Sequence, residues 1–264
     1  HMFTLSAAGG WFDCDYYQKY YEAKKNGFSA MEELGWVNYD LDRARAAIDE
    51  SSVALTCINV QTRNKEYAEL HNFRRGIVCE KTHTVFLKSL EETLAAALKL
   101  NCKRIVVTTG NERDDVSRYV QHTNVVTALR KAAEIVGGSG VKIVLEPLNI
   151  LVDHKGYYMP STAEAVEIID EVGSPDVMVL YDIYHQQITE GNVISTIRAN
   201  IGKIGHFHIG DVPGRREPGT GELNYRNIFK AIAETGYSDY AAFECGRSTD
   251  TVTVCKNMLD LIKW

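Results

Sequence analysis

Short apolar runs alternate with longer segments of helical periodicity along most of the chain. Six runs rich in β-branched residues predict strands, and two weaker ones precede them: 3–7, 29–34, 52–60, 103–109, 141–146, 177–182, 204–209 and 240–245. Successive strands start about 34 residues apart, which is the length of a strand, a helix and two connections.

Helix signals fill the intervals between these strands. In residues 82–101 an apolar residue recurs at every fourth position, which predicts a helix with one buried face. Ser161 and Glu164 have the spacing of a capping box, and Asp40 is placed to cap the helix that follows it. Each predicted strand is therefore followed by a predicted helix.

Eight strand–helix units of this kind favour an α/β fold, the closed (β/α)8 or TIM barrel. Strands too apolar to be exposed on either face are typical of parallel sheets covered by helices. A doubly wound open sheet is the rival, but the first strand is not followed by the G-x-G-x-x-G turn of that fold. No linker or low-complexity segment interrupts the chain, so we expect residues 1–264 to form a single domain.

Composition and net charge argue against several classes of protein, among them nucleic-acid-binding and membrane-spanning proteins. The net charge of −6 argues against a nucleic-acid partner, and no apolar run approaches the ~18 residues needed to cross a membrane. The six cysteines are scattered without a C-x-x-C pair, which favours reduced thiols and a cytoplasmic location. No signal peptide is expected at the start, and residues 1–2 are interpreted as a tag remnant.

Side chains that bind metals end four successive strands: Glu146, Asp182, His208 and Glu244. The strand ends of a barrel share one mouth, and neighbouring strands lie ~4.8 Å apart, so the four groups are expected to converge. Three crowded carboxylates repel one another unless a cation neutralises them. This donor set predicts one divalent metal ion, Mn²⁺, Mg²⁺ or Co²⁺, rather than a structural zinc.

Taken singly, these residues also fit structural roles. Asp182 suits a helix N-cap as well as a metal ligand. His208 could be a buried core histidine, and His206, two residues earlier on the same face, competes with it for the site. Glu146 is harder to explain in this way, because it follows a buried strand and precedes a proline. Their occurrence on four successive strands favours the metal site.

Two residues near this cluster are candidates for substrate binding. His185 follows Asp182 by three residues, where it could bind a substrate oxygen or cap a helix. Arg215 lies in a G-R-R-E-P-G segment and could bind a substrate carboxylate or hydroxyl, or else form a salt bridge with Glu217.

Four more residues are candidates for the pocket wall or a lid. Trp11 and Trp36 follow the first two strands and could line the pocket or pack at the end of the barrel. The long polar loop 61–81 contains His71 and Arg75 and could act as a lid.

Several segments carry more specific motifs: R-G-I at 75–77, L-E-P-L-N at 145–149, Y-D-I-Y-H at 181–185, E-G at 190–191, and D-V-P-G-R with E-P-G-T-G-E inside 205–225. They resemble the hydroxypyruvate isomerase family, in the xylose-isomerase-like barrel superfamily that also holds ketose 3-epimerases and inosose isomerases or dehydratases. The resemblance implies a metal-dependent enzyme that acts on a small sugar or hydroxy-oxo acid, with homo-oligomers common in the family.

The resemblance also assigns roles to residues of this chain. It implies that Glu146, Asp182, His208 and Glu244 hold one divalent metal ion. It implies further that Glu146 and Glu244 are the catalytic acid/base pair, and that His185 and Arg215 contact the substrate.

Two positions depart from the pattern of hydroxypyruvate isomerases. His208 stands where those enzymes usually have Gln and ketose 3-epimerases have His, and Cys245 stands where they commonly have Tyr. The first hypothesis is therefore an isomerase that moves a proton of a small hydroxy-oxo acid or sugar through a cis-enediolate. The alternative is a 3-epimerase of free ketoses, followed by a lyase or dehydratase of an oxidised sugar and a non-catalytic sugar-binding barrel.

Overall fold

In the computed structural model, which describes residues 3–71 and 75–263, the chain forms nine parallel strands. They are β1 (Thr4–Ala8), β2 (Ala30–Glu32), β3 (Ala54–Leu55), β4 (Ile58–Asn59), β5 (Arg104–Val107), β6 (Lys142–Leu145), β7 (Val177–Asp182), β8 (Ile204–Ile209) and β9 (Tyr240–Phe243). The interpreted tag remnant at 1–2 lies outside the described residues.

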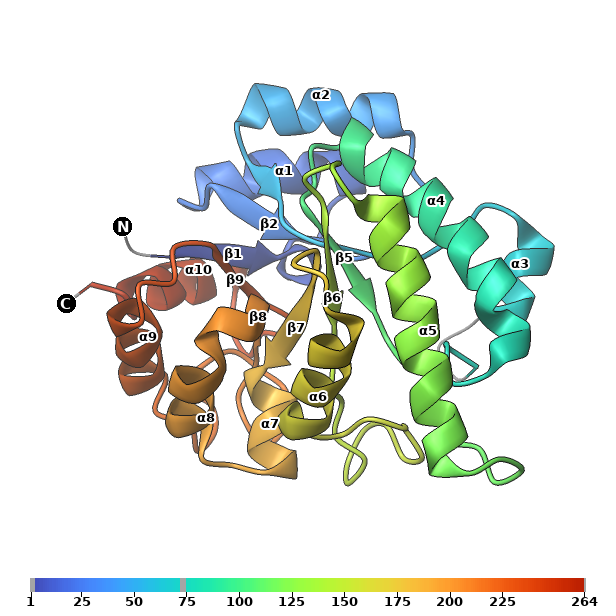
Figure 1. Cartoon of the computed structure of the whole chain (residues 1–264). Coiled ribbons are helices and arrows are strands. Elements are labelled where there is room, and N and C mark those ends of the chain that lie inside the picture. Colours follow the sequence, from blue (N-terminus) through green and yellow to red (C-terminus); the bar gives the residue numbers. More distant parts are fainter. Residues whose placement is uncertain (1–2, 72–74, 264) are drawn as a thin grey trace.

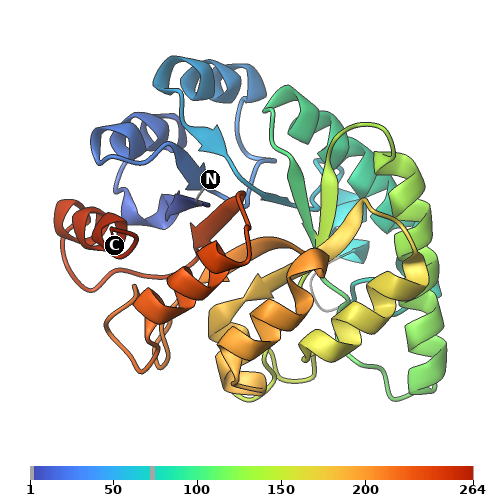
Figure 2. The ribbon, with the colours of Figure 1, turned by 60° about the vertical axis from the view of Figure 1, so that its left-hand side comes forward.

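Helices surround these strands on the outside (Figures 1 and 2). The α-helices are α1 (Tyr16–Lys25), α2 (Leu41–Ser51), α3 (Lys65–Leu70), α4 (His83–Lys99), α5 (Arg118–Val136), α6 (Thr162–Val172), α7 (Ile183–Thr189), α8 (Val193–Asn200), α9 (Tyr225–Glu234) and α10 (Thr251–Asp260). Short 3₁₀ helices are η1 (Gly9–Trp11), η2 (Glu80–Thr82) and η3 (Ile201–Lys203). No helix in the described ranges is long and apolar enough to cross a membrane.

The strands pair in the order β3-β2-β1-β9-β8-β7-β6-β5-β4. The two ends of this order, β3 and β4, are consecutive in the sequence, so the chain itself joins the edges of the curled sheet. The first strand, β1, pairs with the last, β9, in parallel. This arrangement confirms the predicted single α/β barrel.

The predicted strand 52–60 is wrong in one respect, because the structure divides it into β3 and β4. Ala54 pairs with Ala30 of β2, whereas Ile58 pairs with Ile105 of β5. At the break, the Thr56 hydroxyl turns to donate to the Glu32 carboxylate. The segment thus pairs with β2 in its first half and with β5 in its second half. At the break, the buried side chain of Thr56 lies in the barrel interior.

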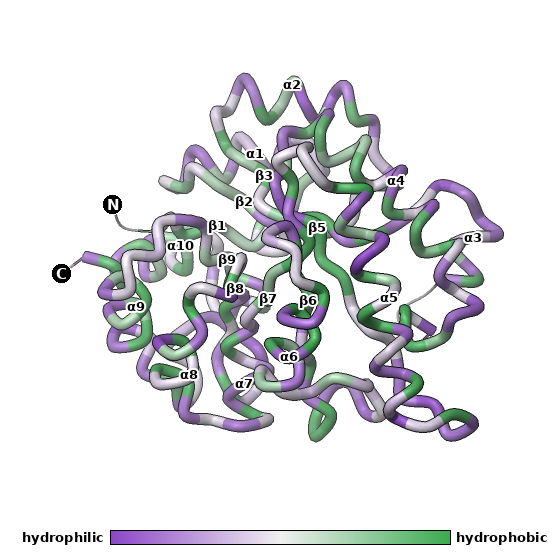
Figure 3. The backbone as a smooth tube through the Cα atoms, viewed as in Figure 1, coloured by the Kyte–Doolittle hydropathy of each residue, from purple (hydrophilic) through white to green (hydrophobic). Residues whose placement is uncertain are grey.

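Successive side chains of each strand point to opposite faces of the sheet and so form two separate apolar cores. In β5, Ile105 and Val107 belong to the large core shared with the helices, while Val106 belongs to a small cluster with Cys57, Val144 and Leu180. Successive strand residues point to opposite faces, so the small cluster fills the barrel interior. The hydropathy colouring of Figure 3 shows mixed colours along the outer helices, as expected for helices with one buried face.

Predicted helix boundaries are confirmed where the capping chemistry is clear. Ser161 and Glu164 form the reciprocal capping box at the start of α6. Asp40 accepts the backbone N–H groups of residues 42 and 43 at the start of α2. Helix α4 occupies 83–99 of the predicted 82–101. These helices return the chain so that all the strands run in one direction.

Candidate active site and metal centre

Four side chains converge at the carboxyl ends of β6 to β9. Asp182 ends β7 and pairs in register with His208 of β8, while Glu146 and Glu244 directly follow β6 and β9. One ligand atom of each of the four residues lies within 4.8 Å of the others. Parallel strands end at the same edge, and this edge gathers residues that lie up to 98 positions apart in sequence.

Two glutamates share one imidazole nitrogen in this cluster. Nδ1 of His208 lies 3.2 Å from Oε1 of Glu146 and 2.9 Å from Oε2 of Glu244. Burial, reinforced by the neighbouring carboxylates, raises the pKa of Glu146 to about 7. Burial would also raise the pKa of Glu244, but His208 and Arg215 outweigh it and lower that pKa to about 2. The carboxyl groups of Glu146 and Glu244 therefore lose their protons at very different pH values.

Asp182 performs both of the roles that its sequence context left open. Its Oδ1 accepts the backbone N–H of His185 at 3.1 Å and caps α7. Its Oδ2 faces the cluster, 3.1 Å from Nη2 of Arg215 and 3.5 Å from Nε2 of His185. Capping fixes the carboxylate in place, so its second oxygen remains available as a ligand.

Arg215 bridges two of the acids. Its Nη2 donates to Asp182 and, at 2.6 Å, to Oε2 of Glu244, and its guanidinium lies over the Tyr184 ring, 5.0 Å from the centroid. The alternative partner, Glu217, instead accepts the backbone N–H of Ser248 at 2.9 Å and 3.0 Å. Arg215 thus points into the site.

A buried carboxylate holds the loop that carries Arg215. Asp211 accepts four backbone N–H groups, from residues 212, 219, 221 and 223. Gly221 lies so close to the backbone that a Cβ there would be 2.0 Å from the carbonyl oxygen of Val212. The glycines of the G-T-G segment at 219–221 therefore form a turn against this carboxylate.

His185 presents a free nitrogen to the site. Asn149 lies with its Nδ2 2.7 Å from Nδ1 of His185, so the amide donates to that nitrogen and places the ring proton on Nε2. Burial lowers the pKa of His185, which favours this neutral form. Nε2 is buried and has no hydrogen-bond partner among the described residues. It can donate a hydrogen bond to an oxygen atom that enters the site.

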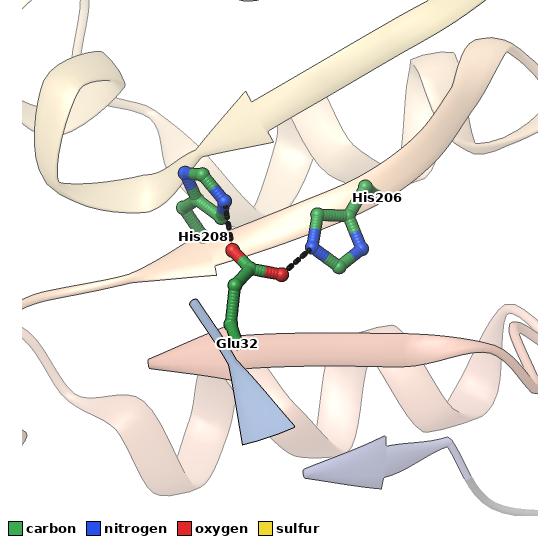
Figure 4. Close-up of side chains that lie close together, drawn as sticks. All are labelled: Glu32, His206 and His208. Carbon is green, nitrogen blue, oxygen red and sulfur yellow. Dashed lines mark hydrogen bonds and ion pairs between the residues drawn. The ribbon is translucent and has the colours of Figure 1, made fainter. Parts of the chain in front are cut away.

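A second cluster, which we call the Glu32 cluster (Glu32, His206 and His208), lies beside the first (Figure 4). From the sequence, His206 was expected only as a competitor of His208, and Glu32 was not predicted as part of a site. The structure uses both histidines, because His206 and His208 contact the two oxygens of Glu32. The available signal was the acid that ends the short run A-M-E of β2, the same strand-end position that identified the other acids.

The four candidates for a pocket wall or lid have different environments. Trp11 and Trp36 are fully buried, and their indole N–H groups donate to the carbonyl oxygens of Cys245 and Asn59. These contacts favour the packing alternative for both tryptophans.

Within the predicted lid 61–81, His71 lines a cavity of about 340 Å³ beside the ends of β4 and β5. Arg75 donates to the carbonyl oxygen of Glu69. Residues 72–74 of this loop lie outside the described part of the chain.

The donors at the four strand ends suit a divalent cation. Three carboxylates and one imidazole form a hard, oxygen-rich set, and the imidazole and the guanidinium of Arg215 both pair with these acids. Burial raises the pKa of Glu146, the carboxylates of Glu244 and Asp182 add to this effect, and a bound cation would counter both. The residues present therefore fit a single divalent metal ion.

Comparisons with known proteins show which family the chain resembles. The model of the family described as xylose isomerase-like TIM barrel matches residues 20–263. The chain is 29% identical over 238 residues to a hydroxypyruvate isomerase of Escherichia coli, covering 90% of each chain. It is 31% identical to a putative hydroxypyruvate isomerase of Xenopus laevis over 87% of this chain and 84% of that protein. A 2-oxo-tetronate isomerase of Cupriavidus necator is 29% identical, with 84% of each chain covered.

Solved structures share the fold at lower identity. One described as an AP endonuclease, family 2, from Brucella melitensis superposes with a TM-score of 0.87 at 23% identity, covering 98% of this chain and 99% of that one. An L-ribulose 3-epimerase superposes with a TM-score of 0.78 at 21% identity, covering 100% and 94%. At such identities these likenesses concern the barrel alone.

Proposed function

Because the chain belongs to the hydroxypyruvate isomerase family of xylose isomerase-like TIM barrels, we propose that it is a divalent-metal-dependent isomerase of a small hydroxy-oxo acid or sugar. The observation that carries the proposal is the convergence of Glu146, Asp182, His208 and Glu244 at the mouth of the barrel. Hydroxypyruvate and a 2-oxo-tetronate are the substrate classes that the relatives' names indicate.

These four residues would hold the ion. When bound, it supplies a Lewis acid that stabilises negative charge on the oxygens of an α-hydroxy carbonyl compound. Glu146 and Glu244 come from strands that two other strands separate, so they approach a substrate from different sides. One carboxylate removes the proton from the hydroxyl-bearing carbon, and the other, in its protonated form, delivers a proton to the neighbouring carbonyl carbon. The hydroxyl proton moves to the former carbonyl oxygen, so that the two oxygens exchange their roles.

His185 and Arg215 orient the substrate in this proposal. The unpartnered Nε2–H of His185 donates to a substrate oxygen, and Asn149 fixes the ring that carries it. Arg215 has a planar fork of donors that matches a carboxylate. The same fork binds hydroxyl oxygens of a neutral sugar less strongly, so Arg215 favours the acid as substrate.

The second candidate is a 3-epimerase of free ketoses. The imidazole at position 208 favours it, since ketose 3-epimerases resemble this chain there and hydroxypyruvate isomerases usually carry an amide. In the epimerase reaction the proton returns to the opposite face of the same carbon rather than to the adjacent carbon. Turnover of hydroxypyruvate compared with that of a ketohexose distinguishes the two candidates.

Both candidates predict exchange with solvent. During turnover in D₂O, we expect one deuterium to appear at the product carbon that receives the proton, because a carboxylate exchanges its proton with water. NMR of the product measures the label. Complete retention of the substrate hydrogen would indicate a hydride shift and would contradict the proton-transfer mechanism.

Arg215→Lys tests the carboxylate contact. Loss of the fork is expected to raise KM for hydroxypyruvate by about 10- to 100-fold, since a hydrogen bond to a charged group contributes about 1.5–3 kcal/mol. Steady-state kinetics measure the change, with the adjacent Arg216→Lys as the matched control. An unchanged KM in the Arg215 variant would remove this residue from substrate binding.

A further inference from the structure

A buried carboxylate lies behind the histidine of the candidate metal centre. Glu32 ends β2 and is 4% exposed. Its Oε1 lies 2.5 Å from Nε2 of His208, and its Oε2 lies 2.8 Å from Nε2 of His206 (Figure 4). The sequence separates Glu32 from these histidines by more than 170 residues, so the contact is created by the closure of the barrel.

The imidazole of His208 therefore lies between two sets of acids. Its Nδ1 faces Glu146 and Glu244, and its Nε2 faces Glu32. An imidazole binds a metal through the nitrogen that carries no proton, so the proton must be on the other nitrogen. A carboxylate at Nε2 keeps the proton there, so that Nδ1, which faces Glu146 and Glu244, is the nitrogen that can give up its proton to a metal ion.

Glu32 is itself held firmly in place. The hydroxyl of Thr56 donates to Oε2 at 2.6 Å, and Thr56 in turn contacts Ser6 at 3.2 Å. Burying a carboxylate is costly unless hydrogen bonds compensate for the lost water. Its partners among the described residues are a hydroxyl and two imidazoles. This polar network crosses the barrel interior from β1 to β8 and ends at a residue of the candidate metal centre.

We propose that Glu32 is a positioning residue that fixes the ring orientation and the protonated nitrogen of His208, so that Nδ1 is presented as a metal ligand. His206 and Thr56 hold the second oxygen of Glu32 and thereby keep the first aligned with His208. The inference rests on the proposed function in that it assigns His208 to the metal centre. It goes further by adding a residue that touches neither metal nor substrate.

The first test uses the metal-free protein. Nitrogen-15 NMR of histidine-labelled protein is expected to show a proton on Nε2 of His208 that is protected from exchange with water. His208→Asn assigns the resonance. Glu32→Gln, which keeps the size of the side chain and removes its charge, is expected to speed exchange of this proton at least several-fold. A His208 Nε2 without a proton, or exchange unchanged by the substitution, would overturn the inference.

The second test measures Mn²⁺ affinity by calorimetry. Glu32→Gln is expected to weaken binding by about 10- to 100-fold, the usual effect of removing the carboxylate partner of a ligating histidine. Glu164→Gln, which makes the same charge change at the start of α6, is expected to leave the affinity unchanged. Thr56→Val removes one of the two contacts to Oε2, the other being His206, and is expected to weaken binding several-fold. This variant keeps the test available if Glu32→Gln fails to fold.

The outcomes separate this inference from the proposed function. If wild-type protein binds no divalent ion, the proposed function fails, and the NMR experiment alone decides whether Glu32 positions His208. If wild-type and Glu32→Gln proteins bind Mn²⁺ equally tightly, the positioning role fails while the metal centre stands.

Discussion

Glu146→Gln and Glu244→Gln are each expected to reduce kcat by about 100- to 10,000-fold, the usual contribution of a positioned acid or base. Glutamine fills the same space, but its amide neither accepts nor releases a proton near neutral pH. Glu146 and Glu244 both lie at Nδ1 of His208, with their pKa values moved in opposite directions. Glu146→Gln replaces a carboxyl group whose pKa is raised in a crowded acidic cluster, so the folded state should tolerate it. Glu244→Gln leaves Arg215 and His208 without one carboxylate partner and should lower the free energy of unfolding more.

The measurement is turnover of hydroxypyruvate and of a ketohexose, together with denaturant unfolding of each variant. Glu164→Gln is the matched control, because Glu164 caps α6 and has no contact with the cluster at the strand ends. Near-normal turnover in either site variant would remove that residue from the acid/base pair. A variant that loses activity because it is unfolded is identified by its unfolding curve.

Removal of divalent ions is expected to abolish turnover, and addition of Mn²⁺, Mg²⁺ or Co²⁺ to restore it. The three carboxylates of the cluster repel one another without a cation, so the ion should also stabilise the folded protein. At a free concentration 100 times its Kd, a ligand that binds only the folded state stabilises it by about 2.7 kcal/mol. Activity after chelation and the free energy of unfolding with and without Mn²⁺ measure the two effects.

The control for this experiment is Asp182→Asn, which removes one proposed ligand and should weaken both effects. Full activity in excess chelator, with no ion found by elemental analysis, would contradict the metal requirement. A change in stability without a change in activity would assign the ion a structural role instead.

The barrel was predictable because its signals are local. Each apolar run and each helical stripe can be recognised within about twenty residues, as in the 82–101 segment that forms α4. The division of 52–60 into β3 and β4 was not predictable, because its two halves pair with different strands, β2 and β5, that only the folded barrel brings beside them. Apolar and β-branched residues continue through the break, so local pattern alone gives one strand.

The residues at the strand ends were predictable for a related reason. In a parallel barrel, a polar residue that ends an apolar strand has a known position, so Asp182 and Glu244 could be placed at one mouth from sequence alone. Glu32 was missed because β2 has three residues and a weak apolar pattern. Its significance comes from His206 and His208, which only the folded barrel brings to it.

The most direct test of the central claim is a crystal structure of the protein soaked in Mn²⁺, with an anomalous difference map recorded at the manganese edge. We expect one strong peak, with an oxygen of Glu146, Asp182 and Glu244 and Nδ1 of His208 all about 2.0–2.3 Å from it. A map with no peak between these side chains, or with the ion bound elsewhere and the four side chains turned apart, would contradict the claim.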